Sequence, residues 1–271
     1  MNATKIIHCD KYGVKSRFIE VDIYPYFEQK KKRKKNKVQR ETCATQANLN
    51  DKRARRYFGQ LAKSNFTNND YHIVLTYAEE VSQEEADKAL ETYIRKTNRR
   101  RKSKGLENAK YMAVTETQKN GNIHHHIIIS GGLSRDEMEA MWTKQRIAWS
   151  KWEKDEKYRE SIKQIGWANC DRLQFNKKGI DELCGYLCKD PKGRKRWRSS
   201  KNLIKPWFRN PKIGGISNNK LSRLCTMPTD CEEFRNYFEK KFKGYELDEA
   251  VTEWNKVTAR WSLYLKLHLI N

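Results

Sequence analysis

Three consecutive histidines, His124, His125 and His126, stand in an otherwise apolar stretch of the chain. Side chains alternate along a β-strand, so His124 and His126 would project from one face and His125 from the other. Imidazoles two residues apart are separated by roughly 6–7 Å along a strand, which lets both ligate one divalent ion. The spacing therefore predicts a metal site that includes His124 and His126 and leaves out His125.

Glu116 is the candidate for a third metal ligand, and its position depends on the turn that follows it. If Asn120-Gly121 forms a two-residue turn, Glu116 lies opposite His125, on the wrong face. If Lys119–Gly121 forms a three-residue loop with Gly121 left-handed, Glu116 lies opposite His124 and shares its face. The sequence allows both registers. A carboxylate with two imidazoles suits Mg²⁺ or Mn²⁺ and leaves open positions for phosphate oxygens.

A tyrosine and a lysine form a second candidate pair farther along the chain. Tyr186 and Lys189 are three residues apart in a predicted helix, and they therefore share one face of it. A phenol, with a pKa near ~10, is a poor nucleophile at neutral pH unless a metal or a cation stabilises its anion. Lys189 would supply such a cation, so we predict Tyr186 as the nucleophile. Asp190 is a reserve metal ligand.

The elements that must position these groups are clearest from residue 70 onward. Strands are predicted over residues 71–77, 110–116, 123–130 and 168–175. Ser82-x-x-Glu85 opens a helix that runs to about residue 101, Ser134-x-x-Glu137 opens a second with apolar residues to Trp152, and a third covers 177–189. The order β-α-β-β-α-β-α predicts an α+β, ferredoxin-like antiparallel sheet with helices over one face.

The regions on either side of this central domain are predicted as extensions. Residues 1–69 form a basic N-terminal extension, residues 70–205 the central domain, and residues 206–271 a helical C-terminal extension. Helices are predicted over residues 51–64, 230–243 and 247–269. In the last of these, an apolar stripe is interpreted as a packing face; its members are Leu247, Val251, Trp254, Trp261 and Leu265.

The composition favours an intracellular protein that binds a polyanion. The chain has 57 Lys and Arg against 34 Asp and Glu, a formal net charge of +23. Phosphates bind such cations through counterion release, so nucleic acid is the expected partner. No apolar run approaches the roughly 18 residues of a membrane span, and no signal peptide opens the chain. Seven cysteines at irregular spacing indicate reduced thiols, and we expect a cytoplasmic protein.

Two basic regions are the candidates for DNA contact. One is a run of like charges in the N-terminal extension, whose alternative interpretation is a solvated tail. The other follows the third predicted helix and interleaves cations with tryptophan. The candidate DNA-binding residues are Lys30, Lys31, Lys32, Arg33, Lys34, Lys35, Arg196, Trp197 and Lys201. Cys184 and Cys188 are interpreted as packing thiols, and His72 and His8 as structural.

These motifs resemble those of the HUH endonucleases. Residues 123–129 are similar to the His-hydrophobic-His strand of that superfamily, with His125 in the middle place. Residues 185–189 resemble the Y-x-x-K helix of its single-tyrosine replication initiators, and residues 71–77 resemble their first motif. The order of the motifs is that of rolling-circle initiators from plasmids, phages and integrative elements of bacteria. The resemblance covers about residues 70–205.

The expected activity is metal-dependent nicking and rejoining of origin DNA. Attack by Tyr186 on a phosphate would give a 5′-phosphotyrosine and release a 3′-OH that primes a host polymerase. The substrate would be single-stranded or hairpin-extruded origin DNA. No phosphate-binding loop is present in the sequence, so a separate host helicase is expected. Two alternatives remain open: a single-tyrosine transposase of the same chemistry, and a non-catalytic nucleic-acid-binding protein. No oligomeric state is predicted.

Overall fold

The computed structural model describes residues 1–27, 44–118, 121–175, 180–188 and 197–270. The chain divides into two compact units, each with its own antiparallel sheet and helices. The first unit contains residues 1–64, 176–179 and 204–271, and the second contains residues 65–175 and 180–203. The α+β class predicted from the sequence is confirmed.

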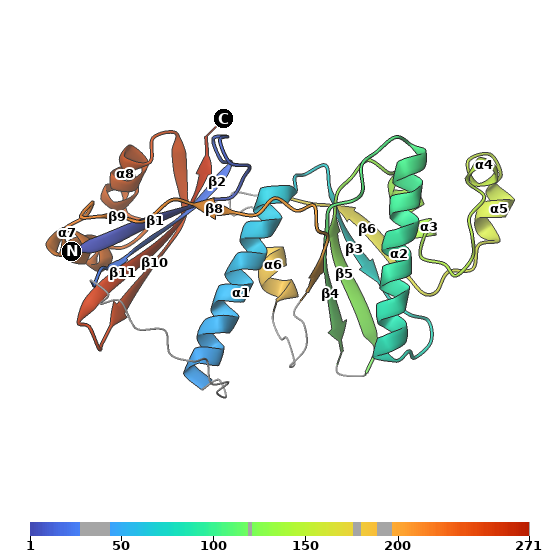
Figure 1. Cartoon of the computed structure of the whole chain (residues 1–271), viewed down its shortest axis with the longest axis horizontal. Helices are drawn as coiled ribbons and strands as arrows, with labels where there is room; N and C mark the ends of the chain where they lie inside the picture. The colour runs from blue at the N-terminus through green and yellow to red at the C-terminus, as the bar shows by residue number, and fades with distance from the viewer. Residues whose placement is uncertain (28–43, 119–120, 176–179, 189–196, 271) are drawn as a thin grey trace, which may run out of the picture. The chain divides into compact units, whose positions relative to one another are not determined.

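The second unit is organised around a five-stranded sheet in the order β6-β3-β5-β4-β7 (Figure 1). All of its neighbouring strands are antiparallel. Four of the strands confirm the strands predicted for the central domain, and β5, which carries the histidines, lies in the middle. The strands are β3 (Tyr71–Leu75), β4 (Tyr111–Thr117), β5 (Ile123–Ile129), β6 (Ala168–Arg172) and β7 (Arg198–Ser199).

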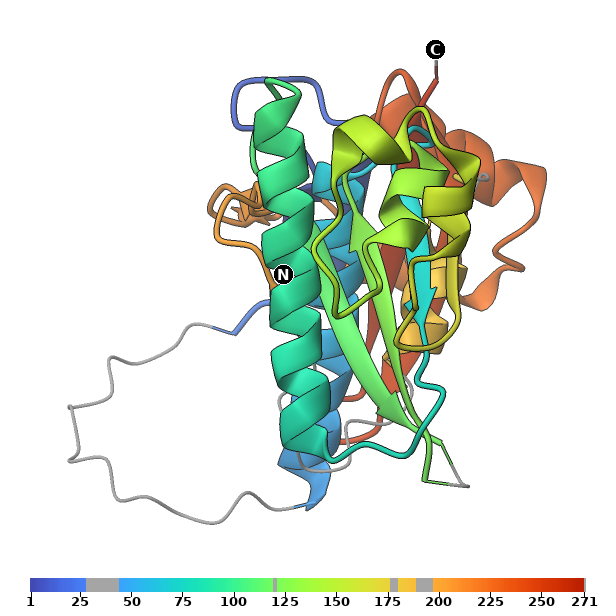
Figure 2. The same ribbon diagram turned by 90° about the vertical axis from the view of Figure 1, so that its right-hand side faces the viewer.

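Helices α2 (Gln83–Ser103) and α3 (Arg135–Ala140) pack on one face of this sheet (Figures 1 and 2). The core between them is apolar and includes Ile73 of β3, Tyr93 of α2 and Ile127 of β5, all nearly inaccessible to solvent. Helix α6 (Asp181–Leu187) lies on the opposite face (Figure 1). Two short helices, α4 (Trp149–Trp152) and α5 (Glu156–Glu160), follow α3.

Both predicted capping boxes are present. Ser82 and Glu85 cap α2 reciprocally, and Ser134 and Glu137 cap α3. The long helix expected after Ser134 is wrong, because α3 ends at Ala140. Tertiary contacts interrupt it: the buried Trp142 indole donates to the Thr76 carbonyl at 2.7 Å.

The first unit contains a six-stranded sheet in the order β10-β11-β2-β1-β8, with β9 also paired to β1. Its helices α7 (Asn218–Thr226) and α8 (Glu232–Lys241) pack on one face of the sheet through Leu224 and Phe234, both fully buried. The strands are β1 (Asn2–His8), β2 (Phe18–Pro25), β8 (Trp207–Phe208), β9 (Lys212–Ile213), β10 (Tyr245–Asn255) and β11 (Arg260–Leu269).

Helix α1 (Ala44–Asn65) contacts the other face of this sheet through buried charges. Glu20 of β2 is 2% exposed and pairs with Arg56 at 2.7 Å and with Lys63 at 3.5 Å. Gln60 donates a further hydrogen bond to Glu20 at 2.6 Å. Burial by itself would raise the pKa of Glu20, but Lys63, Arg56 and Gln60 together hold that pKa below its usual range.

The helix predicted over residues 247–269 is wrong, because this segment forms the hairpin β10-β11. Its apolar stripe at helical spacing overlaps a second pattern of period two, in which Leu263, Leu265 and Leu267 all face the core. Pairing of β11 with both β10 and β2 satisfies its backbone on both sides, and this pairing selects the strand. Residues 206–271 are therefore no purely helical extension, and they share one unit with residues 1–64. The helix predicted over 230–243 is confirmed by α8.

Over the described residues, no helix combines the length and apolarity needed to cross a bilayer.

Candidate active site

The two outer histidines of β5 lie on the face of the sheet that α6 covers. His126 is paired with Val74 of β3 and Val114 of β4, and its ring makes an edge-to-face contact with Tyr186 of α6. By strand alternation His124 projects from this same face. His124 is partly exposed, and its Nδ1 lies 3.3 Å from the Gln118 side-chain nitrogen.

Glu116 lies directly opposite His124, which is the second of the two registers that the sequence allows. Gly121 has a φ of 88°, and its N–H donates to the Gln118 carbonyl at 3.1 Å. This left-handed residue adds one position to the turn and turns Glu116 toward the face of His124 and His126. The Glu116 Oε2 lies 3.5 Å from the His126 Nε2.

His125 lies on the opposite face, in the core beneath α2, and is fully buried. Its Nε2 lies 2.8 Å from the Tyr77 hydroxyl and its Nδ1 2.9 Å from the Thr115 hydroxyl. Burial is the main cause that lowers the pKa of His125 to about 4. A neutral ring with its proton on Nε2 satisfies every partner: it donates to Tyr77, which donates to the Ala86 carbonyl at 3.3 Å, and it accepts from Thr115.

His72 of β3, which the sequence analysis assigns a purely structural role, lies beside His126. Its Nε2 is 3.4 Å from the His126 Nδ1, and the two rings are nearly parallel, with 8° between their planes. Burial, and then the nearby His126, lower the pKa of His72 to about 4; burial also lowers the pKa of His126. Both rings are therefore neutral at neutral pH. The period-two alternation of β3 was the signal that could have placed His72 on this face.

Helix α6 brings Tyr186 to this face from about sixty residues later in the chain. The ring centroids of Tyr186 and His126 are 5.9 Å apart, with 80° between their planes. Cys184 and Leu187 of the same helix are buried and hold it against the unit, in agreement with a packing role for Cys184. Tyr186 itself is 48% exposed, so a ligand can reach it.

The donor chemistry of His124, His126 and Glu116 fits a hard divalent cation such as Mg²⁺ or Mn²⁺. Two imidazoles and one carboxylate share one face on adjacent strands, and two of the three already lie within 3.5 Å. As the side chains are placed, the described residues include no group of three or more His, Cys, Asp or Glu converged as a metal centre. The accessible side chains of His124 and Glu116 can close that distance by rotating about their χ angles.

Several residues predicted to take part fall elsewhere. Trp197, half-buried, precedes β7 at the β4 edge of the sheet, and Lys201 follows that strand as an exposed side chain. The remaining predicted residues lie outside the described part of the chain; they are Lys189, Asp190, Arg196 and Lys30 to Lys35.

Comparison with known proteins gives one match, and it covers the part of the chain that carries this face. Residues 70–191 match the family model of the replication-associated protein ORF2. The match spans somewhat less than half of the chain and includes His72, Glu116, the three histidines and Tyr186. No curated protein and no solved structure matches the chain. This segment is thus similar to replication-associated proteins.

Proposed function

We propose that the chain initiates rolling-circle replication as a single-tyrosine, metal-dependent nickase and strand transferase of the HUH type. The observation that carries the proposal is the contact between Tyr186 and His126, residues from distant parts of the sequence. The match to replication-associated proteins supports the cellular role, and DNA is the partner that this role requires.

In the proposed reaction the Tyr186 oxygen attacks the scissile phosphate. A bond forms between this oxygen and phosphorus, and the bond to the 3′ oxygen breaks, so the products are a 5′-phosphotyrosine and a free 3′-OH. Because the ester conserves the energy of the broken bond, a later 3′-OH can displace Tyr186 and rejoin the strand without ATP.

The remaining residues of this face prepare the site. His126 holds the Tyr186 ring by an edge-to-face contact, and His72 contacts the other ring nitrogen of His126, which fixes its orientation. A Mg²⁺ or Mn²⁺ ion held by His124, His126 and Glu116 would offset the negative charge of the phosphate. The neutral state of His126 is the one that such a ligand needs.

The test is a covalent-adduct assay. The full chain is incubated with Mn²⁺ or Mg²⁺ and labelled single-stranded oligonucleotides that tile the non-coding DNA flanking its gene. We expect one oligonucleotide to give a labelled protein band that survives boiling in detergent and disappears with a chelator.

Tyr186→Phe is the matched control, since it removes one oxygen and leaves the ring contact with His126 in place. The variant should fold and bind the same oligonucleotide with near-normal affinity, yet form no adduct. An adduct that persists in Tyr186→Phe and disappears only when another tyrosine is changed would refute the assignment. DNA binding without any adduct in the wild type would favour the non-catalytic alternative.

A further inference from the structure

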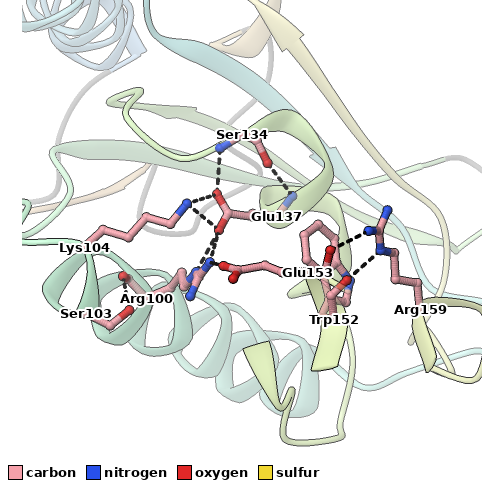
Figure 3. A network of polar contacts seen from close by, with 8 residues as sticks. All are labelled: Arg100, Ser103, Lys104, Ser134, Glu137, Trp152, Glu153 and Arg159. Carbon is pink, nitrogen blue, oxygen red and sulfur yellow. Dashed lines mark hydrogen bonds and ion pairs between the residues drawn. The ribbon is translucent and has the colours of Figure 1, made fainter. Parts of the chain in front are cut away.

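The cations of helix α2 fall into two groups. Those of the first group have partners within the second unit (Figure 3). Arg100 donates to Glu137 at 2.7 Å and to Glu153 at 2.6 Å, and Lys104 donates to Glu137 at 3.0 Å. In the same way Arg101 donates to the backbone carbonyl of Glu107 at 2.6 Å. These side chains hold α2 to the segments around it.

The second group, Arg95, Arg99 and Lys102, is exposed to solvent. These residues are spaced by four and by three positions, so they form one row along the helix. Arg95 donates to the neighbouring Thr92 hydroxyl at 2.9 Å. Over the described residues, none of the three has an ion pair with a carboxylate. The row therefore makes no contribution to the fold that would explain its charge.

The row lines a groove with a volume of about 360 Å³. Its polar lining consists of Glu91, Arg95, Asn98, Arg99, Lys102 and Asn108. The carboxylate of Glu91 is already neutralised, because Arg198 pairs with it at 3.1 Å. The carbonyl oxygen of Asn98 accepts from the Ala109 N–H, so this side chain offers its NH₂ group, a donor, to a ligand. The groove thus presents positive charge and donors, which suit an anion.

We propose that this groove binds the phosphate backbone of duplex DNA. With a rise of 1.5 Å per residue, Arg95 and Lys102 lie roughly 10 Å apart along the helix axis. That length matches about three successive phosphates of one duplex strand. The lining includes no aromatic ring on which an unpaired base could stack, which favours a paired backbone over a single strand.

This surface goes beyond the proposed nicking site. Leu90, Tyr93 and Ile94 pack α2 against the sheet face opposite Tyr186 and His126. DNA held by α2 is therefore separate from the strand that Tyr186 would attack, and we assign it to duplex that flanks the nicked region. Contacts made only with phosphates bind without regard to sequence.

The test measures binding of the full chain to a duplex of arbitrary sequence over a series of salt concentrations. The variant carries Arg95→Ala, Arg99→Ala and Lys102→Ala. The matched control carries Lys88→Ala, Lys151→Ala and Lys154→Ala, which remove the same charge from exposed positions outside the groove. Each lost phosphate contact should lower the slope of log K against log salt by about 0.9, and weaken binding about tenfold near 0.1 M salt.

We expect a loss of slope close to three contacts in the groove variant and a much smaller loss in the control. Equal losses in both would refute the groove, because general charge would then explain the effect. An equal loss for single-stranded and duplex DNA would refute the choice of duplex. If the triple variant unfolds, the three single variants decide, each with an expected loss of about one contact.

Adduct formation on a short single strand separates this inference from the proposed function. The groove variant should retain the adduct, because none of its changes touches the face of Tyr186. If the wild type forms no adduct but the groove variant still loses duplex binding, the nicking proposal fails and the groove stands.

Discussion

Replacing His125 with leucine should destabilise the fold without removing the chemistry. In the wild type, His125 is fully buried and is bonded to Tyr77 at 2.8 Å and to Thr115 at 2.9 Å. Leucine has a similar volume and cannot bond to either hydroxyl. The metal-facing histidines His124 and His126 lie on the other face of the strand, so their side chains keep their positions.

The size of the effect follows from the two lost hydrogen bonds. An intramolecular hydrogen bond contributes about 1 kcal/mol, and a buried group left without a partner costs about 1–3 kcal/mol. Tyr77 keeps the Ala86 carbonyl as an acceptor, so the larger cost falls on Thr115. We expect His125→Leu to lower the free energy of unfolding by about 2–3 kcal/mol.

Urea unfolding followed by circular dichroism measures the stability, and the adduct assay measures the activity of the folded fraction. The matched variant is His124→Ala, which changes a partly exposed side chain and should leave stability within about 0.5 kcal/mol while abolishing the adduct. A stable but inactive His125→Leu would refute this reasoning, because it would place His125 in the chemistry and not in the core.

Three further outcomes are expected. Glu20→Gln should destabilise the first unit by about 3–5 kcal/mol, because it leaves Lys63 buried without its carboxylate. Since the folded-state pKa of Glu20 is lowered, its stabilisation is present at neutral pH and is lost as the pH falls below about 5; urea midpoints of Glu20→Gln should depend less on pH there. Gly166→Ala should reduce stability, since its Cβ would lie 2.3 Å from the Thr76 carbonyl oxygen. Gly185→Ala, with nothing within 4 Å of its Cβ, should instead stabilise α6 by up to about 1 kcal/mol in thermal melts.

The sequence alone determined the elements of the second unit. The capping boxes at Ser82 and Ser134 mark helix starts by contacts between residues three apart, so they need no tertiary structure. The apolar run around the histidines predicts a strand, and alternation along it separates His125 from His124 and His126. Such local rules hold wherever neighbouring residues decide the outcome.

Residues between elements were less predictable. The hairpin β10-β11 carries both a helical stripe and a period-two pattern, and only pairing with β2 decides between them. The helix after Ser134 ends early because Trp142 finds a partner in Thr76, sixty-six residues away. Neither contact can be inferred from the residues next to it.

Only the tertiary structure decided the composition of the candidate site. The left-handed Gly121 sets the register that brings Glu116 opposite His124, where the sequence allowed two. Pairing of β3 with β5 places His72 against His126, and packing of α6 on the sheet brings Tyr186 to the same ring. The physical reason is that these side chains come from separate elements, whose approach is fixed by sheet register and core packing and not by spacing along the chain.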